Sequence, residues 1–388
     1  MTTSEQAYVW IWLPDAAEPI VAGVLKRHGE KAHFAYGTRY LERPDAIALF
    51  TPELPLQRGE FVPDSAIASC IRDASPDAWG RRVIMHHLLN PDRHDADPVE
   101  LDEITYLLES GSDRIGALDF QRSATDYEPR DKTSASLTML SEATALISAG
   151  RPLPPGLELA LRHGTSIGGA RPKALIDADE RKFIAKFSVS TDLYNVVKAE
   201  FVAMRLAALA GIDAAAVQLT ESVGRDVLLV ERFDRYRQAR QWRRRSMVSA
   251  LTILALDEML ARYASYELLA DQIRHGFSAP GATLRELYRR MLFNVMVGNT
   301  DDHARNHAAF WDGRQLTLTP AYDLCPQMRT GREASQAMRL CGQQNLSQLA
   351  VCFAAAPRFL LSRDAAIQMA EQLLNTLIQH WPLVCDAA

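Results

Sequence analysis

The stretch N-T-D-D-H-A-R-N at residues 299–306 places two carboxylates, an imidazole, a guanidinium and carboxamides side by side. An amphipathic pattern at 284–297 precedes it and predicts a helix that ends at Gly298. Two strand-like runs joined by the D-G turn at 312–313 follow it and predict a β-hairpin, after which comes the lone acid Asp323. A solvated loop, a metal site and a phosphate-handling site are all compatible with this stretch alone. The neighbouring segments are needed to distinguish these three interpretations.

Composition sets broad limits on the class of protein. The chain has 388 residues, enough for two or three domains, with 47% hydrophobic and 23% charged residues and a net charge of −5. No global positive charge draws it to nucleic acid. Its five scattered cysteines without a CxxC pair indicate free thiols in a reducing compartment. The N-terminus lacks a signal-peptide pattern, and no run reaches the roughly 18 apolar residues of a membrane span, so we expect a cytoplasmic protein.

The N-terminal part reads as a β-containing domain. Ser75 and Pro76 are residues typical of a helix N-cap and first turn, and they predict a helix over 75–89. Strand-like runs lie on both sides of this helix, at residues 9–13, 20–25, 32–36 and 111–120.

The middle of the chain contains two charges at apolar positions. A strand is predicted at 182–188 and a helix at 194–210. Lys186 lies in the strand, and Glu200 lies at or near the apolar stripe of the helix. An ion pair between them would satisfy both, because a buried carboxylate is costly when unpaired. Alternatively, Glu200 lies at the edge of the stripe and reaches water while the Lys186 side chain extends to solvent.

The order of these segments has a chemical meaning. Phosphoryl transfer needs metal ligands, a lysine on the phosphates and a carboxylate that receives the acceptor's proton. In protein kinases the base Asp precedes a metal-binding Asn by five positions, and another Asp follows a short hairpin. Asp301 and Asn306 have this spacing, Asp323 follows the hairpin, and residues 227–234 stand where a hinge would hold adenine. With the Lys186–Glu200 pair, five features in this order predict phosphoryl transfer far more specifically than the Asp–Asn spacing alone.

Several segments resemble those of one particular family. T-S-I-G-G-A-R-P-K (165–173), V-E-R-F-D-R (230–235), N-T-D-D-H-A-R-N and P-A-Y-D (320–323) look like the signature segments of HipA-type serine/threonine kinases, the toxins of bacterial toxin–antitoxin pairs. The N-terminal S-P-D-A-W-G-R-R and G-S-D-R-I-G-A-L are also similar to that family. The resemblance implies an α+β, bilobal, protein-kinase-like (HipA-like) fold with an N-terminal β-containing domain and a mostly helical C-terminal lobe.

The resemblance also implies a domain division and roles for individual residues. The domains would be a β-containing domain at 1–125, a nucleotide-binding lobe at 126–235 and a helical lobe with the catalytic loop at 236–388. Asp301 would be the catalytic base, with His303 in an auxiliary role, and Asn306 and Asp323 would ligate Mg²⁺. ATP would contact the phosphate loop, the strand lysine with its glutamate partner, and the hinge, namely Gly168, Gly169, Ala170, Arg171, Lys173, Lys186, Glu200, Glu231, Arg232 and Phe233.

Two features depart from the general kinase pattern. The loop has no G-x-G-x-x-G, and D-F-G is replaced by Asp323-Leu324-Cys325. Ser166 matches the loop serine whose autophosphorylation inactivates family members, although Thr165 is an equally available acceptor by its chemistry.

The function implied is Mg²⁺-dependent transfer of the ATP γ-phosphoryl group to a protein Ser or Thr. The target would be a translation component such as an aminoacyl-tRNA synthetase. The partner would be a HipB-type helix-turn-helix antitoxin, and the protein would contact DNA only indirectly, through this antitoxin. The cellular process implied is persistence. A non-catalytic, nucleotide-gated module in a DNA-bound repressor complex is the alternative, and a small-molecule kinase would use the same residues.

Simpler expectations apply to the remaining features. We expect Asp302 to be solvated, and His303 and His307, four residues apart, to be no zinc site, because no Glu accompanies them. The basic run at 235–245 is expected to be an exposed hairpin with its charges in solvent. A helix capped by Ser362 is predicted over 360–378.

Overall fold

The computed structural model describes residues 4–89, 101–130, 136–148, 151, 154, 157, 165, 169–178, 180–189 and 192–388. The chain divides into two compact units, each described below by itself. Unit 1 comprises residues 1–191, 221–227 and 234–247, and unit 2 comprises residues 192–220, 228–233 and 248–388. The division into three domains at 125 and 235 stays a prediction.

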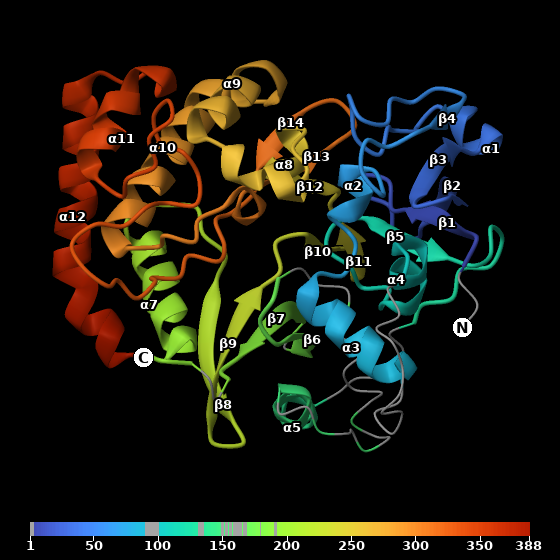
Figure 1. Cartoon of the computed structure of the whole chain (residues 1–388), viewed down its shortest axis with the longest axis horizontal. Coiled ribbons are helices and arrows are strands. Elements are labelled where there is room, and N and C mark those ends of the chain that lie inside the picture. Colours follow the sequence, from blue (N-terminus) through green and yellow to red (C-terminus); the bar gives the residue numbers. More distant parts are fainter. Residues whose placement is uncertain are drawn as a thin grey trace. The chain divides into compact units, whose positions relative to one another are not determined.

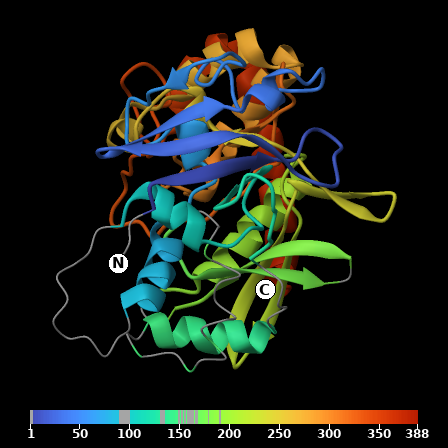
Figure 2. The same ribbon diagram turned by 90° about the vertical axis from the view of Figure 1, so that its right-hand side faces the viewer.

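An antiparallel sheet with the strand order β4-β3-β2-β1-β5 forms the N-terminal part of unit 1 (Figures 1 and 2). Its strands are β1 (Gln6–Ile11), β2 (Ile20–His28), β3 (Lys31–Tyr36), β4 (Glu60–Phe61) and β5 (Leu118–Gln121). Alternate residues of β3 are buried, as expected for a strand with one face on a core. Strands predicted at 9–13, 20–25 and 32–36 are therefore present with shifted ends, whereas only the last part of 111–120 is a strand.

The helices of unit 1 are α1 (Thr38–Leu41), α2 (Ser69–Arg72), α3 (Ala78–Leu89), α4 (Glu103–Glu109) and α5 (Leu137–Ser148). Of these, α1 and α4 contact strands of the sheet, whereas α5 contacts β6 (Lys173–Ala178). Trp79 and Val83 of α3 pack against α5, and both views show these two helices close together (Figures 1 and 2). The predicted helix start at Ser75 is wrong, because α3 begins at Ala78. The Ser75 hydroxyl instead donates to Glu103 Oε2 at 3.3 Å.

Two hairpins complete unit 1, β6–β7 (Lys173–Ala178 and Arg181–Phe187) and β10–β11 (Arg235–Gln238 and Gln241–Arg244). The second hairpin confirms the expectation for the basic run, but its charges are not all in solvent. Arg235 is buried, and its Nη2 donates to Asp113 Oδ1 at 2.8 Å. That guanidinium anchors the hairpin, which is why a basic residue can be buried there.

The connecting strands β8 (Val217–Ser222) and β9 (Arg225–Glu231) have residues in both units. Unit 2 is otherwise mainly helical. It holds α7 (Val196–Leu209), α8 (Ala250–Ile253), α9 (Tyr266–Gly276), α10 (Pro280–Val297), α11 (Leu349–Ala355), α12 (Arg363–Asp386), the 3₁₀ segments η2 (Glu258–Tyr263), η3 (Ala304–Asn306) and η4 (Ala356–Phe359), and a sheet of β12 (Met247–Ser249), β13 (Ala308–Trp311) and β14 (Leu316–Leu318).

The core of unit 2 packs α7, α10 and α12 against one another. Phe201 and Met204 of α7, Phe293 of α10 and Leu377 of α12 belong to one buried cluster, and α12 (red) runs beside α7 (green) in Figure 1. Ser362 caps α12 as predicted, accepting from Ala365 N at 3.1 Å, although the helix continues to Asp386. No helix in the part of the chain that the structure describes has the length and apolar character needed to cross a membrane.

Candidate active site

The end of α10 positions the polar loop. Leu287, Met291 and Leu292 are completely buried and hold the helix in the core. Gly298 then adopts a φ of 74°, a left-handed conformation that glycine tolerates best, and Asn299 N donates to Asn294 O at 2.9 Å. The loop therefore leaves a rigid helix in a defined direction.

Asp301 and Asn306, the predicted base and metal ligand, are joined within this loop. Asp301 is exposed, whereas Asn306 lies at the end of η3 and is only 8% exposed. Asn306 Nδ2 donates to the Asp301 backbone O at 3.3 Å. Because the amide nitrogen is used in this way, Oδ1 is the Asn306 atom that would serve as a cation ligand.

Asp323 lies in a segment that is tied to the same loop. Its φ of 61° is in the left-handed region, which a non-glycine residue adopts at a cost and which clusters at functional sites. On one side, Ala321 N donates to Asp213 O at 2.7 Å, and on the other, Gln327 N donates to Gly298 O at 3.0 Å. These backbone bonds hold Asp323 near the start of the 299–306 loop.

The electrostatics of Asp301 reflect this proximity. Although the Asp301 side chain reaches solvent, the protein atoms around its carboxyl partly desolvate it and raise its pKa; His303 opposes the rise, and the nearby charges of Asp323 and Asp302 add to it. Carboxylates that repel one another in this way form a set of hard oxygen donors that suits Mg²⁺, since a divalent cation would relieve the repulsion. Asn306 and Asp323 as metal ligands, with Asp301 as the catalytic base beside them, stay predictions.

A buried polar network contacts the 299–306 loop, and the sequence analysis did not predict it. Asp302 is 2% exposed, so the expectation that it is solvated is wrong. Its Oδ2 accepts from the Tyr266 hydroxyl, and its Oδ1 lies 2.9 Å from His307 Nε2. His307 Nε2 makes no hydrogen bond in the structure, so this contact is a close approach of the two groups. Asn294 Nδ2 donates to the Tyr266 hydroxyl at 3.2 Å, and Asn299 Nδ2 donates to Asn294 Oδ1 at 3.0 Å.

Burial and the neighbouring Asp302 carboxylate raise the pKa of Tyr266 far above its usual value, so its hydroxyl stays a donor. One signal could have revealed this network in the sequence. Asn294 stands between Phe293 and Val295 in the apolar part of α10, where a carboxamide requires a partner.

The predicted hinge residues of unit 2 are ordered by backbone and aromatic contacts. Glu231 N donates to Ala216 O at 2.8 Å, and Arg232 is 5% exposed. The Phe233 ring lies 5.9 Å from that of Phe310 and 5.7 Å from that of Tyr322. The backbone is therefore held in place, and its role in binding adenine stays a prediction.

Glu200 of α7 is 4% exposed, which makes the alternative that it reaches water wrong. Lys186 is half-buried in β7. These two residues belong to different units, so their ion pair stays a prediction.

The predicted phosphate loop is described in part. Ser166 and Gly168 lie outside the described residues. Gly169 has a φ of 102°, and Lys173 Nζ lies only 2.2 Å from the point where a Cβ on Gly169 would stand. Ala170 is exposed and Arg171 is half-buried.

Two lysines face each other across the β6–β7 hairpin. Lys173 pairs directly with Lys186, so their side chains share one face of the hairpin. Two amines on one face of a hairpin are a chemistry that can bind an anionic phosphate. The hairpin therefore fits the predicted contact with ATP phosphates.

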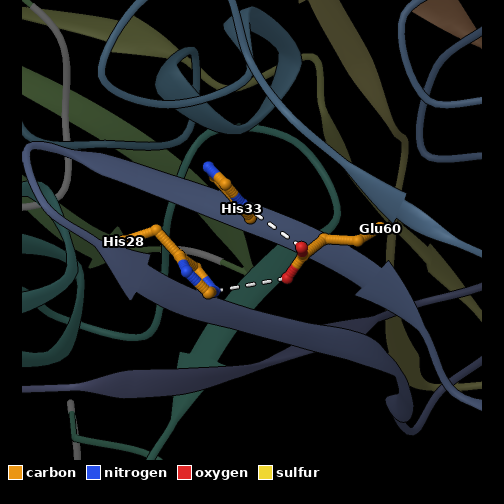
Figure 3. A group of neighbouring side chains, drawn as sticks. All are labelled: His28, His33 and Glu60. Carbon is orange, nitrogen blue, oxygen red and sulfur yellow. Dashed lines mark ion pairs between the residues drawn. The ribbon is translucent and has the colours of Figure 1, made fainter.

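Among the described residues, one group could offer three ligands to a metal ion, namely His28, His33 and Glu60 (Figure 3). His28 Nε2 and His33 Nδ1 lie 3.3 Å and 3.4 Å from the two oxygens of Glu60. The imidazole rings are stacked, with centroids 4.3 Å apart and planes 14° apart. A metal ion lies close to the plane of each imidazole that binds it, and these two nearly parallel, stacked planes do not meet at one ion. We therefore interpret the group as two imidazoles sharing one carboxylate, and His303 and His307 take no part in it.

Comparison with known proteins supports the class that this fold and site indicate. The family of HipA N-terminal domains matches residues 12–121, and the family of HipA-like C-terminal domains matches residues 165–381. The second match alone covers more than half of the 388 residues. The chain belongs to the HipA family, as its sequence segments predicted.

Two curated relatives are similar over part of their length. The putative kinase Y4mE of Sinorhizobium fredii is 32% identical over 130 residues, which are 31% of this chain and 30% of that protein. The serine/threonine-protein kinase toxin HipA of Shewanella oneidensis is 27% identical over 183 residues, which are 41% of this chain and 42% of that protein. The alignments thus span less than half of either relative.

A solved structure is similar over nearly the whole chain. It is the HipA, HipB and operator DNA complex of the Shewanella oneidensis MR-1 toxin–antitoxin system, with a TM-score of 0.72 and 19% identity, covering 98% of this chain and 91% of that one. This likeness confirms the predicted α+β, kinase-like HipA fold.

Proposed function

We propose that this protein is an ATP- and Mg²⁺-dependent serine/threonine protein kinase and the toxin of a bacterial toxin–antitoxin pair. The observation that carries the proposal is the joining of Asp301, Asn306 and Asp323 in unit 2. Asn306 donates to the Asp301 backbone at 3.3 Å, and the Asp323 carboxylate is close enough to raise the Asp301 pKa. Phosphoryl transfer requires a base for the acceptor hydroxyl and oxygen ligands for the metal ion, and these three residues would provide both.

Each residue has a defined task in this mechanism. Asp301, exposed at the surface, accepts the hydrogen bond and then the proton of the incoming Ser or Thr hydroxyl. Asn306 and Asp323 hold Mg²⁺, which would supply charge neutralisation at the phosphates. Lys186 and Lys173, on one face of their hairpin, contact phosphate oxygens. His303 lies close enough to Asp301 to oppose the rise in its pKa, which is the auxiliary role proposed for it.

The proposed partner is suggested by a solved relative, whereas the proposed substrate comes from the family resemblance alone. We infer a HipB-type antitoxin, since the solved relative is in a complex with HipB and operator DNA. A translation component such as an aminoacyl-tRNA synthetase is the proposed substrate.

Autophosphorylation is assigned to Ser166 and not to Thr165. Thr165 is 1% exposed and its Oγ1 accepts from Gly111 N at 3.0 Å, so its hydroxyl is poorly placed to reach a phosphate donor. Phosphopeptide mapping after incubation with Mg²⁺ and ATP is expected to find phosphate on Ser166. Phosphate on Thr165 would contradict the assignment.

Radiolabelled ATP tests the activity itself. Wild-type protein with Mg²⁺ should transfer label to a protein in a bacterial lysate, while Asp301→Asn should not. Absence of label with both proteins would contradict the kinase proposal. Equal growth arrest by wild type and Asp323→Ala would favour the non-catalytic alternative.

A further inference from the structure

The turn that begins α3 holds Gly169 of the T-S-I-G-G-A-R-P-K segment by both of its backbone polar groups. Asp77 Oδ2 accepts from Gly169 N at 2.7 Å. Trp79 N donates to Gly169 O at 3.3 Å. All three residues belong to unit 1. Since both its N–H and C=O are engaged in this way, Gly169 is an anchor point of the segment.

The same turn contacts the segment at Thr165. A Cβ built on Gly80 would lie 2.1 Å from the Thr165 backbone O, so α3 packs against this carbonyl as closely as a glycine allows. Thr165 is buried, and its Oγ1 accepts from Gly111 N at 3.0 Å. Gly111 opens the other N-terminal segment that resembles the family, G-S-D-R-I-G-A-L.

Trp79 extends the contact to the start of β6. Its indole Nε1 donates to Lys173 O at 3.1 Å, and its side chain is completely buried. Lys173 Nζ in turn lies beside Gly169. The S-P-D-A-W-G turn therefore touches the segment at Thr165, Gly169 and Lys173.

The Asp77 carboxylate is itself oriented. Its Oδ1 accepts from Arg72 Nη1 at 3.1 Å, and its side chain is 13% exposed. A carboxylate fixed by a guanidinium and shielded from water makes a strong hydrogen bond to a backbone N–H. Asp77 thus contributes a charged, directional contact to Gly169, in addition to the packing of Trp79 and Gly80.

We propose that Asp77 is a positioning residue for nucleotide binding: by anchoring Gly169 it holds Gly169 and the neighbouring Lys173 in the geometry that binds ATP. This inference rests on the proposed kinase function. Under this inference, Asp77 in the N-terminal region contributes to ATP affinity, in addition to any role of that region in binding an antitoxin.

Binding of a non-hydrolysable ATP analogue with Mg²⁺, measured by calorimetry, tests the inference. Asp77→Ala loses a charge-assisted hydrogen bond, so its Kd is expected to rise roughly tenfold or more. Asp77→Asn keeps an acceptor oxygen and should bind with intermediate affinity. Asp45→Ala is the matched control, because Asp45 is an exposed carboxylate of the same unit paired with Arg43, and it should bind as wild type does. In kinetics the change should be in the KM for ATP, with kcat little altered.

Amide hydrogen exchange separates this inference from the kinase proposal. Gly169 N–H should be protected in the wild type and exchange faster in Asp77→Asn, which also serves if Asp77→Ala does not fold. Wild-type protein that binds no analogue but shows a protected Gly169 contradicts the kinase proposal and leaves the anchor supported. Wild-type binding that Asp77→Ala and Asp77→Asn both retain, or an unprotected Gly169 in the wild type, overturns the inference.

Discussion

His307 Nε2 lies 2.9 Å from Asp302 Oδ1, and the two side chains are 3% and 2% exposed. A carboxylate this deeply buried is stable only with partners, and the Tyr266 hydroxyl supplies a second one. Asp302 directly follows Asp301 in the chain. The buried contacts of Asp302 therefore fix the backbone that presents the Asp301 carboxylate to solvent.

Asp302→Ala should destabilise unit 2. The substitution leaves the Tyr266 hydroxyl without its buried acceptor and removes the close contact with His307, and a buried donor left unsatisfied costs about 1–3 kcal/mol. Urea unfolding is expected to show a loss of this size. A loss under about 1 kcal/mol would mean that the network does not support the loop.

Asp301→Asn should reduce activity without reducing stability. It removes a carboxylate that Asp323 and Asp302 repel, so the free energy of unfolding should be unchanged or slightly higher. Phosphotransfer should fall by about 100-fold or more, because the proton acceptor is gone. Thermal unfolding and a radiolabel assay measure the two effects, and destabilisation comparable to that of Asp302→Ala would contradict this account.

The φ of 61° at Asp323 predicts a difference between two replacements. Glycine adopts this conformation freely, so Asp323→Gly should change stability by less than about 1 kcal/mol. Asp323→Val should destabilise more, because a β-branched residue is strained at positive φ. Both should abolish Mg²⁺-dependent activity. Denaturant melts of equal midpoint for the two variants would argue against the strained backbone.

Asp119 gives unit 1 a defined acid sensitivity. Burial alone would raise its pKa, but the charges of Arg130 and Arg114, 2.7 Å and 2.9 Å from its Oδ1, outweigh burial and hold the pKa below its ordinary value. The unfolded chain therefore binds this proton more readily than the folded one. The stabilisation is complete above the unfolded pKa of about 3.9 and is lost as pH falls toward the folded pKa.

Asp119→Asn should lower stability at neutral pH and make unfolding less dependent on pH below about 4. Thermal melts across this range check the slope. An unchanged slope in the variant would show that other carboxylates dominate acid unfolding.

Local patterns predicted much of the site. The periodicity of α10, the glycine at 298, the D-G hairpin and the five-residue spacing of Asp301 and Asn306 depend on neighbours in sequence, and the structure has the helix, turn and hairpin where these patterns placed them. The helix start at Ala78 was missed because Ser75 bonds to Glu103, a residue from a distant segment.

The partners of the buried polar residues could not be predicted, although Asn294 in the apolar part of α10 indicates that a buried polar group needs one. The sequence gives no sign that Asp302 meets Tyr266, since α9 and the loop are brought together by the core of unit 2. Arg235 is buried for a similar reason, because Asp113 from the N-terminal region accepts its hydrogen bonds. A single charged residue in a polar run is indistinguishable from its solvated neighbours until the fold supplies a partner.

Intact mass spectrometry tests the central claim most directly. Phosphatase-treated wild-type protein, incubated with Mg²⁺ and ATP, should gain the mass of one phosphoryl group, and Asp301→Asn treated identically should gain none. Wild-type protein that gains no mass and labels no lysate protein, or an Asp301→Asn protein that gains mass as fast as the wild type, would contradict the assignment of Asp301, Asn306 and Asp323 as a phosphotransfer site.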